Sequence, residues 1–204
     1  MATHCTIAAT PDTLDLVYRL RYACYHRSGA IPACESERFT DRYDRLENHF
    51  SFLLQTAEPA EAATVRISVV APERGWVDCP SRSVFGDHPA FARIAGAKFV
   101  EASRLCFGRQ ARRDAFYGVV AHLAALAELH GAEWVVACPR EEHCGIYQRL
   151  FGFEPLAEPR QYFGVNFKTS LLAISLEDLR RRADGIKSMR GAWQEALAGL
   201  AAVS

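Results

Sequence analysis

The order in which helical and extended patterns follow one another constrains the fold of this 204-residue chain more than any other feature. Apolar residues three and four apart predict helices, and alternating apolar and polar residues predict strands. The patterns give helices at 11–27, 112–131 and 140–150, and strands at 49–55, 62–70, 98–107, 133–138, 153–157 and 162–174. Thr10 and Pro11 suit the N-cap and first position of a helix. This order predicts an α/β (α+β) fold in which helices flank a mixed sheet.

The segments between these elements divide the chain further. The 28–47 segment reads as a long loop with one helical turn, and a loop of that length is uncommon unless it is functional. We expect a hairpin loop at 57–60, and at 71–96 an insertion beside the sheet with a short helix at 90–94. After residue 175 a three-and-four apolar spacing predicts one or two helices. The chain therefore divides into a domain at 1–174 and an extension at 175–204, which either packs on the domain or forms a homodimer.

Composition excludes several classes of protein. Half of the residues are apolar, which excludes disorder, and 24 basic residues balance 24 acidic ones. Residues 1–100 hold 11 basic and 12 acidic residues, and 101–204 hold 13 and 12, so binding of nucleic acid through net charge is not expected. Seven cysteines without a CxxC pair favour reduced thiols. With neither a signal peptide nor an apolar run long enough to span a membrane, we expect a cytoplasmic protein.

Charged residues inside apolar patterns mark candidate functional positions. Arg21 falls on the apolar face of the first helix, where a guanidinium needs a carboxylate or a ligand because it cannot lose its charge. Asp41 and Asp44 are candidate partners, so a structural ion pair and a substrate-binding role both stay open. Arg66 lies in mid-strand between polar residues, which indicates either a lined cleft or the water-facing side of an edge strand.

Two opposite charges, Glu101 and Arg104, lie within the apolar strand at 98–107. Such charges indicate an ion pair, a functional site or both. In a regular strand residues three apart point to opposite faces, so the two share a cleft only if the strand is bulged between them. Otherwise Glu101 shares its face with Phe99, Ser103 and Leu105.

Together these positions resemble one branch of the GNAT acyltransferase superfamily, the N-acyl amino acid synthases (FeeM-like) and acyl-homoserine-lactone synthases. The resemblance covers about residues 12–174. It rests on Arg21-x-x-x-Tyr25, Asp41-x-Tyr43-Asp44, Arg66, Glu101-x-Ser103-Arg104 and the segment Ile146-Tyr147-Gln148-Arg149-Leu150-Phe151-Gly152-Phe153-Glu154-Pro155.

The resemblance implies a GNAT fold whose central strands splay apart to admit a phosphopantetheine arm, and a bulge in the strand that carries Glu101. It implies no bound cofactor and an acyl-carrier-protein or CoA thioester as donor. The implied catalytic residues are Glu101, as base, and Arg104. The implied substrate-binding residues are Arg21, Tyr25, Asp41, Asp44, Arg66 and Ser103. The implied contacts of the acyl donor and its phosphopantetheine are Leu105, Phe107, Arg109, Arg112 and Arg113.

The chain also departs from the family pattern. Residues 26–75 hold no tryptophan, which favours the amino acid branch over lactone synthases. The 109–114 stretch lacks the glycines of acetyl-CoA enzymes, and its arginines suit one phosphodiester and an acidic carrier protein, or are simply solvated. Tyr147 precedes Gly152 by five residues instead of four, which favours core packing over a role as proton donor. His143 and Cys144 have no support as a nucleophilic pair, and the histidines lack metal-ligand spacing, so no metal is expected.

We therefore expect an N-acyltransferase that moves a long-chain fatty acyl group from acyl carrier protein to an amino acid by direct aminolysis. An arginine at 21, 66 or 104 would hold the acceptor carboxylate, and backbone amides near 105–107 would stabilise the oxyanion. Four aromatic residues either line an acyl tunnel or pack in the core: Phe50, Phe52, Phe99 and Phe107. The alternatives are a lactone synthase that uses S-adenosylmethionine, an enzyme acylating another amine, a sugar or a peptide, and a non-catalytic protein that binds acyl chains or carrier protein.

Overall fold

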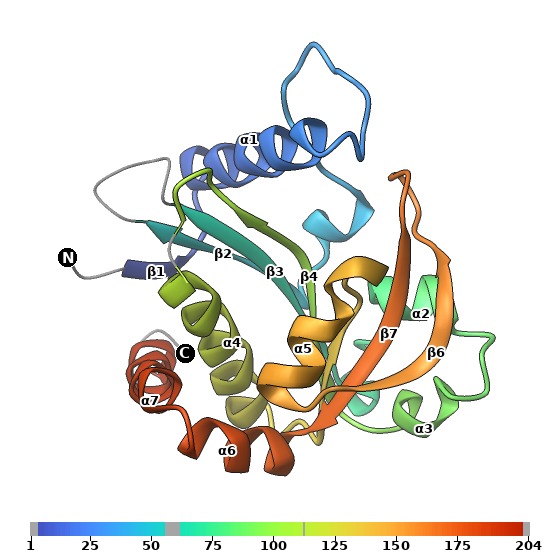
Figure 1. The fold of residues 1–204 in the computed structure, drawn as a ribbon, viewed down its shortest axis with the longest axis vertical. Coiled ribbons are helices and arrows are strands. Elements are labelled where there is room, and N and C mark those ends of the chain that lie inside the picture. The colour runs from blue at the N-terminus through green and yellow to red at the C-terminus, as the bar shows by residue number, and fades with distance from the viewer. Residues whose placement is uncertain (1–3, 56–61, 112, 202–204) are drawn as a thin grey trace.

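A single mixed sheet organises the protein, whose computed structural model describes residues 4–55, 62–111 and 113–201. The sheet has seven strands in the order β1-β2-β3-β4-β5-β7-β6 (Figure 1). The β4–β5 pair is parallel and every other neighbouring pair is antiparallel. The strands are β1 (His4–Ile7), β2 (His49–Gln55), β3 (Ala63–Val70), β4 (Phe99–Phe107), β5 (Trp134–Ala137), β6 (Glu154–Gln161) and β7 (Lys168–Ser175). The predicted mixed sheet is confirmed.

Helices cover both faces of this sheet (Figure 1). One face carries α1 (Pro11–Arg27), α2 (Pro80–Phe85) and α3 (Ala92–Ala95), and the other carries α4 (Arg113–Leu129), α5 (Cys144–Phe151), α6 (Leu176–Asp184) and α7 (Lys187–Ala201). Among the described residues there are also short 3₁₀ turns: η1 (Arg42–Arg45), η3 (Pro72–Arg74) and η4 (Glu141–His143). The start of α1 is as predicted, because the Thr10 side chain accepts from the Thr13 amide and Pro11 occupies the first turn.

The two central strands separate half-way along β4. Pairing with β5 covers only Phe99–Ala102, opposite Trp134–Ala137, while β4 itself continues to Phe107. We call residues 99–102 the paired half of β4 and residues 103–107 its split half. The split half still pairs with β3 on its other side. The strands therefore splay as the resemblance implied, and an opening forms between the split half and the chain that follows β5.

A β-bulge marks the start of the split half. In the register with β3, Thr64 faces Cys106 and Arg66 faces Ser103, so two residues of β4 lie opposite one of β3. The bulged Arg104 has φ +54°, in the left-handed region that a non-glycine residue seldom adopts. The bulge turns the Arg104 side chain to the α1 side of the sheet, the same side as Ser103. The predicted bulge is thus present.

Several boundaries differ from those expected. β1 was not anticipated, because four residues on a sheet edge carry too short a pattern to detect, and neither was the six-residue α2. The strand expected from residue 162 begins at Lys168, because the aromatic residues before it form the turn of the β6–β7 hairpin. The hairpin loop expected at 57–60 lies outside the described residues.

The two terminal helices pack on α4. Trp193, Ala196 and Leu200 of α7 belong to the same buried cluster as Val120 and Leu123 of α4. Apolar packing between α4 and α7 therefore accounts for the three-and-four spacing of the C-terminal residues; a role in dimerisation stays a prediction. Within residues 4–55, 62–111 and 113–201, no helix has the length and apolar character needed to cross a bilayer.

Candidate active site

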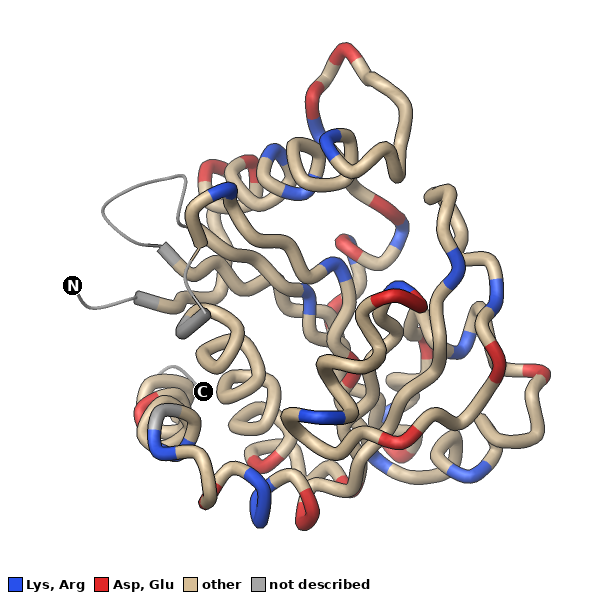
Figure 2. The backbone as a smooth tube through the Cα atoms, viewed as in Figure 1, with Lys and Arg blue, Asp and Glu red and all other residues tan. Residues whose placement is uncertain are grey.

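Five of the predicted charged residues form one buried ion-pair cluster. Arg21 of α1 donates from Nη1 to Asp44 Oδ1 at 2.7 Å. Arg66 of β3 donates to Asp41 Oδ1 at 2.5 Å and to Asp44 Oδ1 at 3.1 Å. Arg104 of β4 donates from Nε and Nη2 to Asp41 Oδ2, at 3.0 and 2.8 Å. Segments far apart in the sequence are thereby joined at one point. In Figure 2, basic and acidic positions meet where the turn after α1 lies against the sheet.

The two aspartates are held rigidly by a short turn. Asp41 is the N-cap of η1, where its side chain accepts from the Tyr43 amide, and the Asp44 side chain accepts in return from the Asp41 amide at 3.0 Å. This reciprocal capping orients both carboxylates through bonds that do not involve the arginines. The 28–47 loop is therefore anchored to the sheet through its one helical turn.

The cluster carries more positive than negative charge. Burial disfavours the charge of Asp41, but hydrogen bonds and charge from Arg66 and Arg104 prevail and hold its pKa well below the usual range. Arg66 and Arg104 are desolvated, yet their acidic neighbours keep the pKa of each above the ordinary value. Three guanidinium groups thus meet two carboxylates, an excess of one positive charge in a buried setting.

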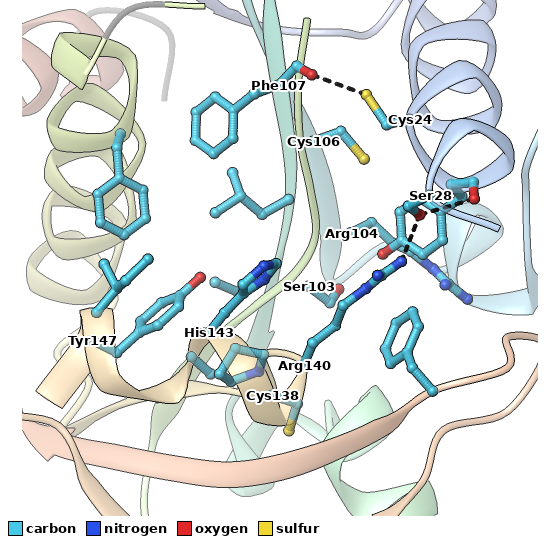
Figure 3. A pocket seen from close by; sticks show the side chains of 18 residues that line it. Cys24, Ser28, Ser103, Arg104, Cys106, Phe107, Cys138, Arg140, His143 and Tyr147 are labelled. Atoms are coloured by element: carbon cyan, nitrogen blue, oxygen red, sulfur yellow. Dashed lines mark hydrogen bonds between the residues drawn. The ribbon is translucent and has the colours of Figure 1, made fainter. Parts of the chain in front are cut away.

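A pocket of about 520 Å³ lies in the opening between the splayed strands (Figure 3). The split half of β4 forms one wall, the 137–147 segment another, and the end of α1 a third. The lining residues are Cys24, Tyr25, Ser28, Ala102, Ser103, Arg104, Leu105, Cys106, Phe107, Phe116, Ala137, Cys138, Pro139, Arg140, His143, Ile146, Tyr147 and Phe167. The wall is mostly hydrocarbon, which suits an acyl chain or a pantetheine arm.

The predicted site residues fall into three groups around this pocket. Tyr25, Ser103, Arg104, Leu105 and Phe107 line it. The other members of the ion-pair cluster lie behind Arg104 and Ser103, where Arg66 Nε donates to the Ser103 hydroxyl at 3.1 Å. Of the donor-site arginines, Arg109 is exposed in the loop after β4, while Arg112 and the side chain of Arg113 lie outside the described residues. Of the four aromatic candidates only Phe107 lines the pocket; Phe50, Phe52 and Phe99 pack in the apolar clusters.

Glu101 is placed differently from the other candidates. Its carboxylate accepts from the Ser81 amide at 3.1 and 3.0 Å and from the Ser81 hydroxyl at 2.6 Å. The residue is fully buried and is not among the described residues that line the pocket. Burial raises the pKa of Glu101, and the bonds from Ser81 only partly oppose that rise. Its role as catalytic base stays a prediction.

The structure adds pocket residues that the sequence interpretation missed, such as Arg140, or gave no role, such as His143. Arg140 follows β5, donates to the Ser28 hydroxyl at 2.7 Å and lies 4.3 Å over the ring of Phe167. His143, three residues further on, directs its ring into the pocket (Figure 3). Their position in the segment that follows β5, one of the two splayed strands, was the available signal. Tyr147 both packs on Phe116 and lines the pocket.

Two cysteines, Cys24 and Cys106, approach each other from two walls of the pocket. Cys24 of α1 donates to the Phe107 carbonyl at 3.1 Å, and Arg27 reaches its sulfur at 3.7 Å. Interaction with the Cys106 thiol and the charge of Arg27 lower the pKa of Cys24 to about 7, although burial opposes this. α1 is thereby tied to the far end of the split half.

Comparison with known proteins agrees with this geometry. Residues 16–175 match the family described as N-acyl amino acid synthase FeeM. The chain belongs to that family. It is therefore an acyltransferase, and the expectation of an enzyme is confirmed.

Solved structures with the same fold are distant in sequence. The structure of FeeM, an N-acyl amino acid synthase from uncultured soil microbes, superposes with a TM-score of 0.72 at 17% identity, covering 89% of this chain and 94% of that one. The CoA-dependent acyl-homoserine lactone synthase BjaI, with S-adenosylmethionine and isopentyl-CoA, gives 0.61 at 19% identity, covering 90% and 88%. The lactone synthase LasI gives 0.63 at 14%, covering 86% and 91%. These likenesses confirm the GNAT-like fold. No curated protein matches the chain.

Proposed function

We propose that this member of the FeeM family transfers a long-chain fatty acyl group from an acyl-carrier-protein thioester to the amine of an amino acid. One observation carries the proposal: a mostly apolar pocket of about 520 Å³ has Arg104 in its wall, and the buried cluster that Arg104 belongs to has an excess positive charge. An acyl chain and a carboxylate-bearing acceptor would thus meet in one cavity.

The apolar part of the pocket would receive the donor. Leu105 and Phe107 of the split half, Phe116 of α4 and Ile146 of α5 supply hydrocarbon walls. Backbone amides of the split half that are freed from β5 would stabilise the oxyanion of the tetrahedral intermediate. The pantetheine arm would lie along the strand edge that β5 leaves open.

Basic residues that suit a carrier protein lie at the pocket and near it. Arg140 lines the pocket, Arg27 donates to the carbonyl of the pocket-lining Phe107 at 3.4 Å, and Arg109 follows Phe107 by two residues in the chain. Arg27 and Arg109 are exposed. A phosphodiester and an acidic carrier surface are the partners that guanidinium groups bind most specifically. CoA as donor is an outcome that the experiment below separates from carrier protein.

The acceptor ammonium must lose a proton before it attacks the thioester. Glu101 is sealed against Ser81, whereas His143 directs its ring into the pocket. Histidine is the side chain best suited to exchange protons near neutral pH. We therefore propose His143 as the group that takes this proton directly, and we keep Glu101 as the competing assignment from the sequence.

To test the function, the purified protein is incubated with each amino acid and with a C12–C18 acyl chain carried by acyl carrier protein or by CoA. Mass spectrometry then identifies the products. N-acyl amino acids from the carrier-protein donor support the proposal. Acyl-homoserine lactones formed with S-adenosylmethionine, or acylation of amines alone, would replace it with another acyltransferase activity. Tight binding of acyl carrier protein with no product would contradict the proposed function.

Two variants test which residue is the catalytic base. Removing a general base costs about 10²–10⁴ in rate, so His143→Gln should lose that much and Glu101→Gln much less. The reverse ranking, in variants with the wild-type circular dichroism and melting temperature, would restore Glu101 as the base. The substitution Glu141→Gln supplies the control, because Glu141 is exposed two residues before His143 and is not among the described residues that line the pocket.

A further inference from the structure

Two thiols come together where the end of α1 meets the split half of β4. Cys24 lies in α1 and Cys106 in the split half, and both line the pocket (Figure 3). Cys24 Sγ donates at 3.1 Å to the carbonyl of Phe107, the residue that follows Cys106. The two thiols also interact directly with each other. Two residues far apart in the chain thus bring their sulfur atoms to one place in the pocket wall.

Cys24 has the properties of a thiol that reacts first with an oxidant. It is partly exposed in the pocket wall, and Arg27 Nη2 lies 3.7 Å from its sulfur. The Cys106 thiol and the charge of Arg27 lower the pKa of Cys24 to about 7, although burial opposes this. A large share of Cys24 is therefore thiolate near neutral pH, and the thiolate is the form that peroxides oxidise.

Cys106 has the opposite properties. It is only 3% exposed, and burial raises the pKa of its thiol well above the ordinary value. Cys106 therefore keeps its proton and does not compete with Cys24 for the oxidant. A reactive thiol beside a second thiol that can resolve it is typical of redox-sensing sites.

The other cysteines are less suited to form such a pair. Cys34 is exposed and is not among the described residues that line the pocket. Burial raises the pKa of the Cys79 and Cys138 thiols well above the ordinary value, so neither supplies a thiolate. Cys24 and Cys106 therefore combine a reactive thiol with a protected one at the same pocket.

We propose that a peroxide joins Cys24 and Cys106 in a disulfide, which locks α1 onto the split half of β4 and slows acyl transfer through the pocket. The Cys24 thiolate attacks one oxygen of hydrogen peroxide, the O–O bond breaks, and hydroxide leaves Cys24 as a sulfenic acid. The Cys106 sulfur then displaces the hydroxyl group from the Cys24 sulfur, and this group takes up the Cys106 proton and leaves as water. The peroxide gains the two electrons that the thiols lose.

The position of the bond explains its effect on the pocket. A covalent bond holds two sulfur atoms closer together than unbonded thiols can lie, so the two pocket walls that carry Cys24 and Cys106 are drawn together. The inference rests on the proposed function only in taking the acyl donor to enter this pocket. The identity of the acceptor plays no part in it.

Peptide mapping tests whether the bond forms. The full-length protein is treated with hydrogen peroxide, its remaining thiols are blocked with N-ethylmaleimide, and the tryptic peptides are identified by mass spectrometry. Cys24 is the only cysteine in the tryptic peptide 22–27, and Cys106 is the only one in 105–109. These two peptides should appear linked, and dithiothreitol should separate them. Absence of the linked peptide, or Cys34 as the main site of oxidation, would overturn the proposal.

Acyl transfer tests what the bond does. The peroxide-treated wild type should lose most of its rate and recover it in dithiothreitol, whereas Cys24→Ser and Cys106→Ser should each keep their own untreated rate. Cys34→Ser is the matched control, because it removes an exposed thiol and should lose rate as the wild type does. An equal loss in every one of these proteins, or a linked peptide without loss of rate, overturns the switch.

The outcomes separate this inference from the proposed function. If the products are lactones or other amides, the proposed function fails, and the same comparison of rates still decides the switch. If no acceptor gives a product, hydrogen–deuterium exchange decides it, because backbone amides at 22–28 and 105–108 should exchange more slowly in the oxidised protein. Exchange that is the same in the reduced and oxidised proteins overturns the switch.

Discussion

The two halves of β4 have opposite surroundings although they belong to one continuous strand. The paired half has strands on both sides, and its Glu101 is fully buried against Ser81. The split half has a strand on one side only, and each of its five residues lines the pocket. Arg104, three residues from Glu101, is turned by the bulge to the ion-pair cluster.

This difference shows how the fold separates stability from chemistry. Where the sheet is complete, a charged side chain must find its partners inside the protein, as Glu101 does. Beyond Ala102, where the pairing of β4 with β5 ends, the edge of β4 and its side chains become available to a ligand. The bulge adds a residue at that boundary, so the chain gains a charged side chain without losing its pairing to β3.

The largest expected effect concerns what holds the split half in place. If the ion pairs do so, Asp41→Asn should lower the free energy of unfolding by about 3 kcal/mol, because it removes the carboxylate that pairs with both Arg66 and Arg104 and leaves their buried charge uncompensated. Urea denaturation measures this. Arg19→Met is the control, since Arg19 forms an exposed pair with Asp15 at 2.8 Å that is worth about 0–1 kcal/mol. Equal losses for the two variants would contradict the comparison.

A smaller effect separates packing in one half from ligand contact in the other. Val100 in the paired half is fully buried, so Val100→Ala should cost about 2 kcal/mol of stability and leave the acylation rate unchanged. Leu105 in the split half is partly exposed in the pocket, so Leu105→Ala should cost about 1 kcal/mol or less and shift the preferred acyl length. Denaturation curves and a chain-length series report both; a reversed pattern would break the comparison.

The smallest expected effect is a pH dependence of stability that comes from His49, which lies beside the paired half of β4. Ser68, which faces Glu101 in the sheet, is bonded to His49, and burial together with the charge of Arg66 lowers the pKa of His49 to about 4. Between pH 6.5 and 4 the unfolded chain takes up this proton and the native protein does not, so His49 makes stability fall as pH falls.

The comparison that isolates this effect is wild type against His49→Gln. Relative to the variant, the wild type should lose about 1 kcal/mol of stability from pH 7 to pH 4.5, measured by denaturation at each pH. A difference between the two proteins that stays constant over this range would show that His49 does not titrate as described.

The sequence predicted the elements with long, regular patterns and the charges that those patterns could not accommodate. The start of α1, the strands β2, β3 and β4 and the ion-pair residues were all identified in this way. Short elements such as β1 and α2 were missed, because four or six residues do not establish a period. Aromatic residues before β7 were assigned to a strand, because an apolar run looks the same in a ladder and in an aromatic stack.

The candidate site shows the same limit of prediction from sequence. Arg104 was identified because a charge stands out in an apolar strand, and Tyr25 because its position matches the family pattern. His143 was considered but given no role, and Arg140 was missed, because the segment after β5 has no regular spacing. Which residues line the pocket depends on the distances between segments remote in the sequence.

By itself the sequence determined a mixed α/β domain with buried arginines that must find carboxylates, because periodicity and an uncompensated charge are local properties. The expectation of an acyltransferase came from its resemblance to a known family. Only the tertiary structure decided which arginine faces the pocket and which glutamate does not. The register of β3 on β4 and the end of the β4–β5 ladder set those positions, and both arise from contacts between segments that the chain order does not bring together.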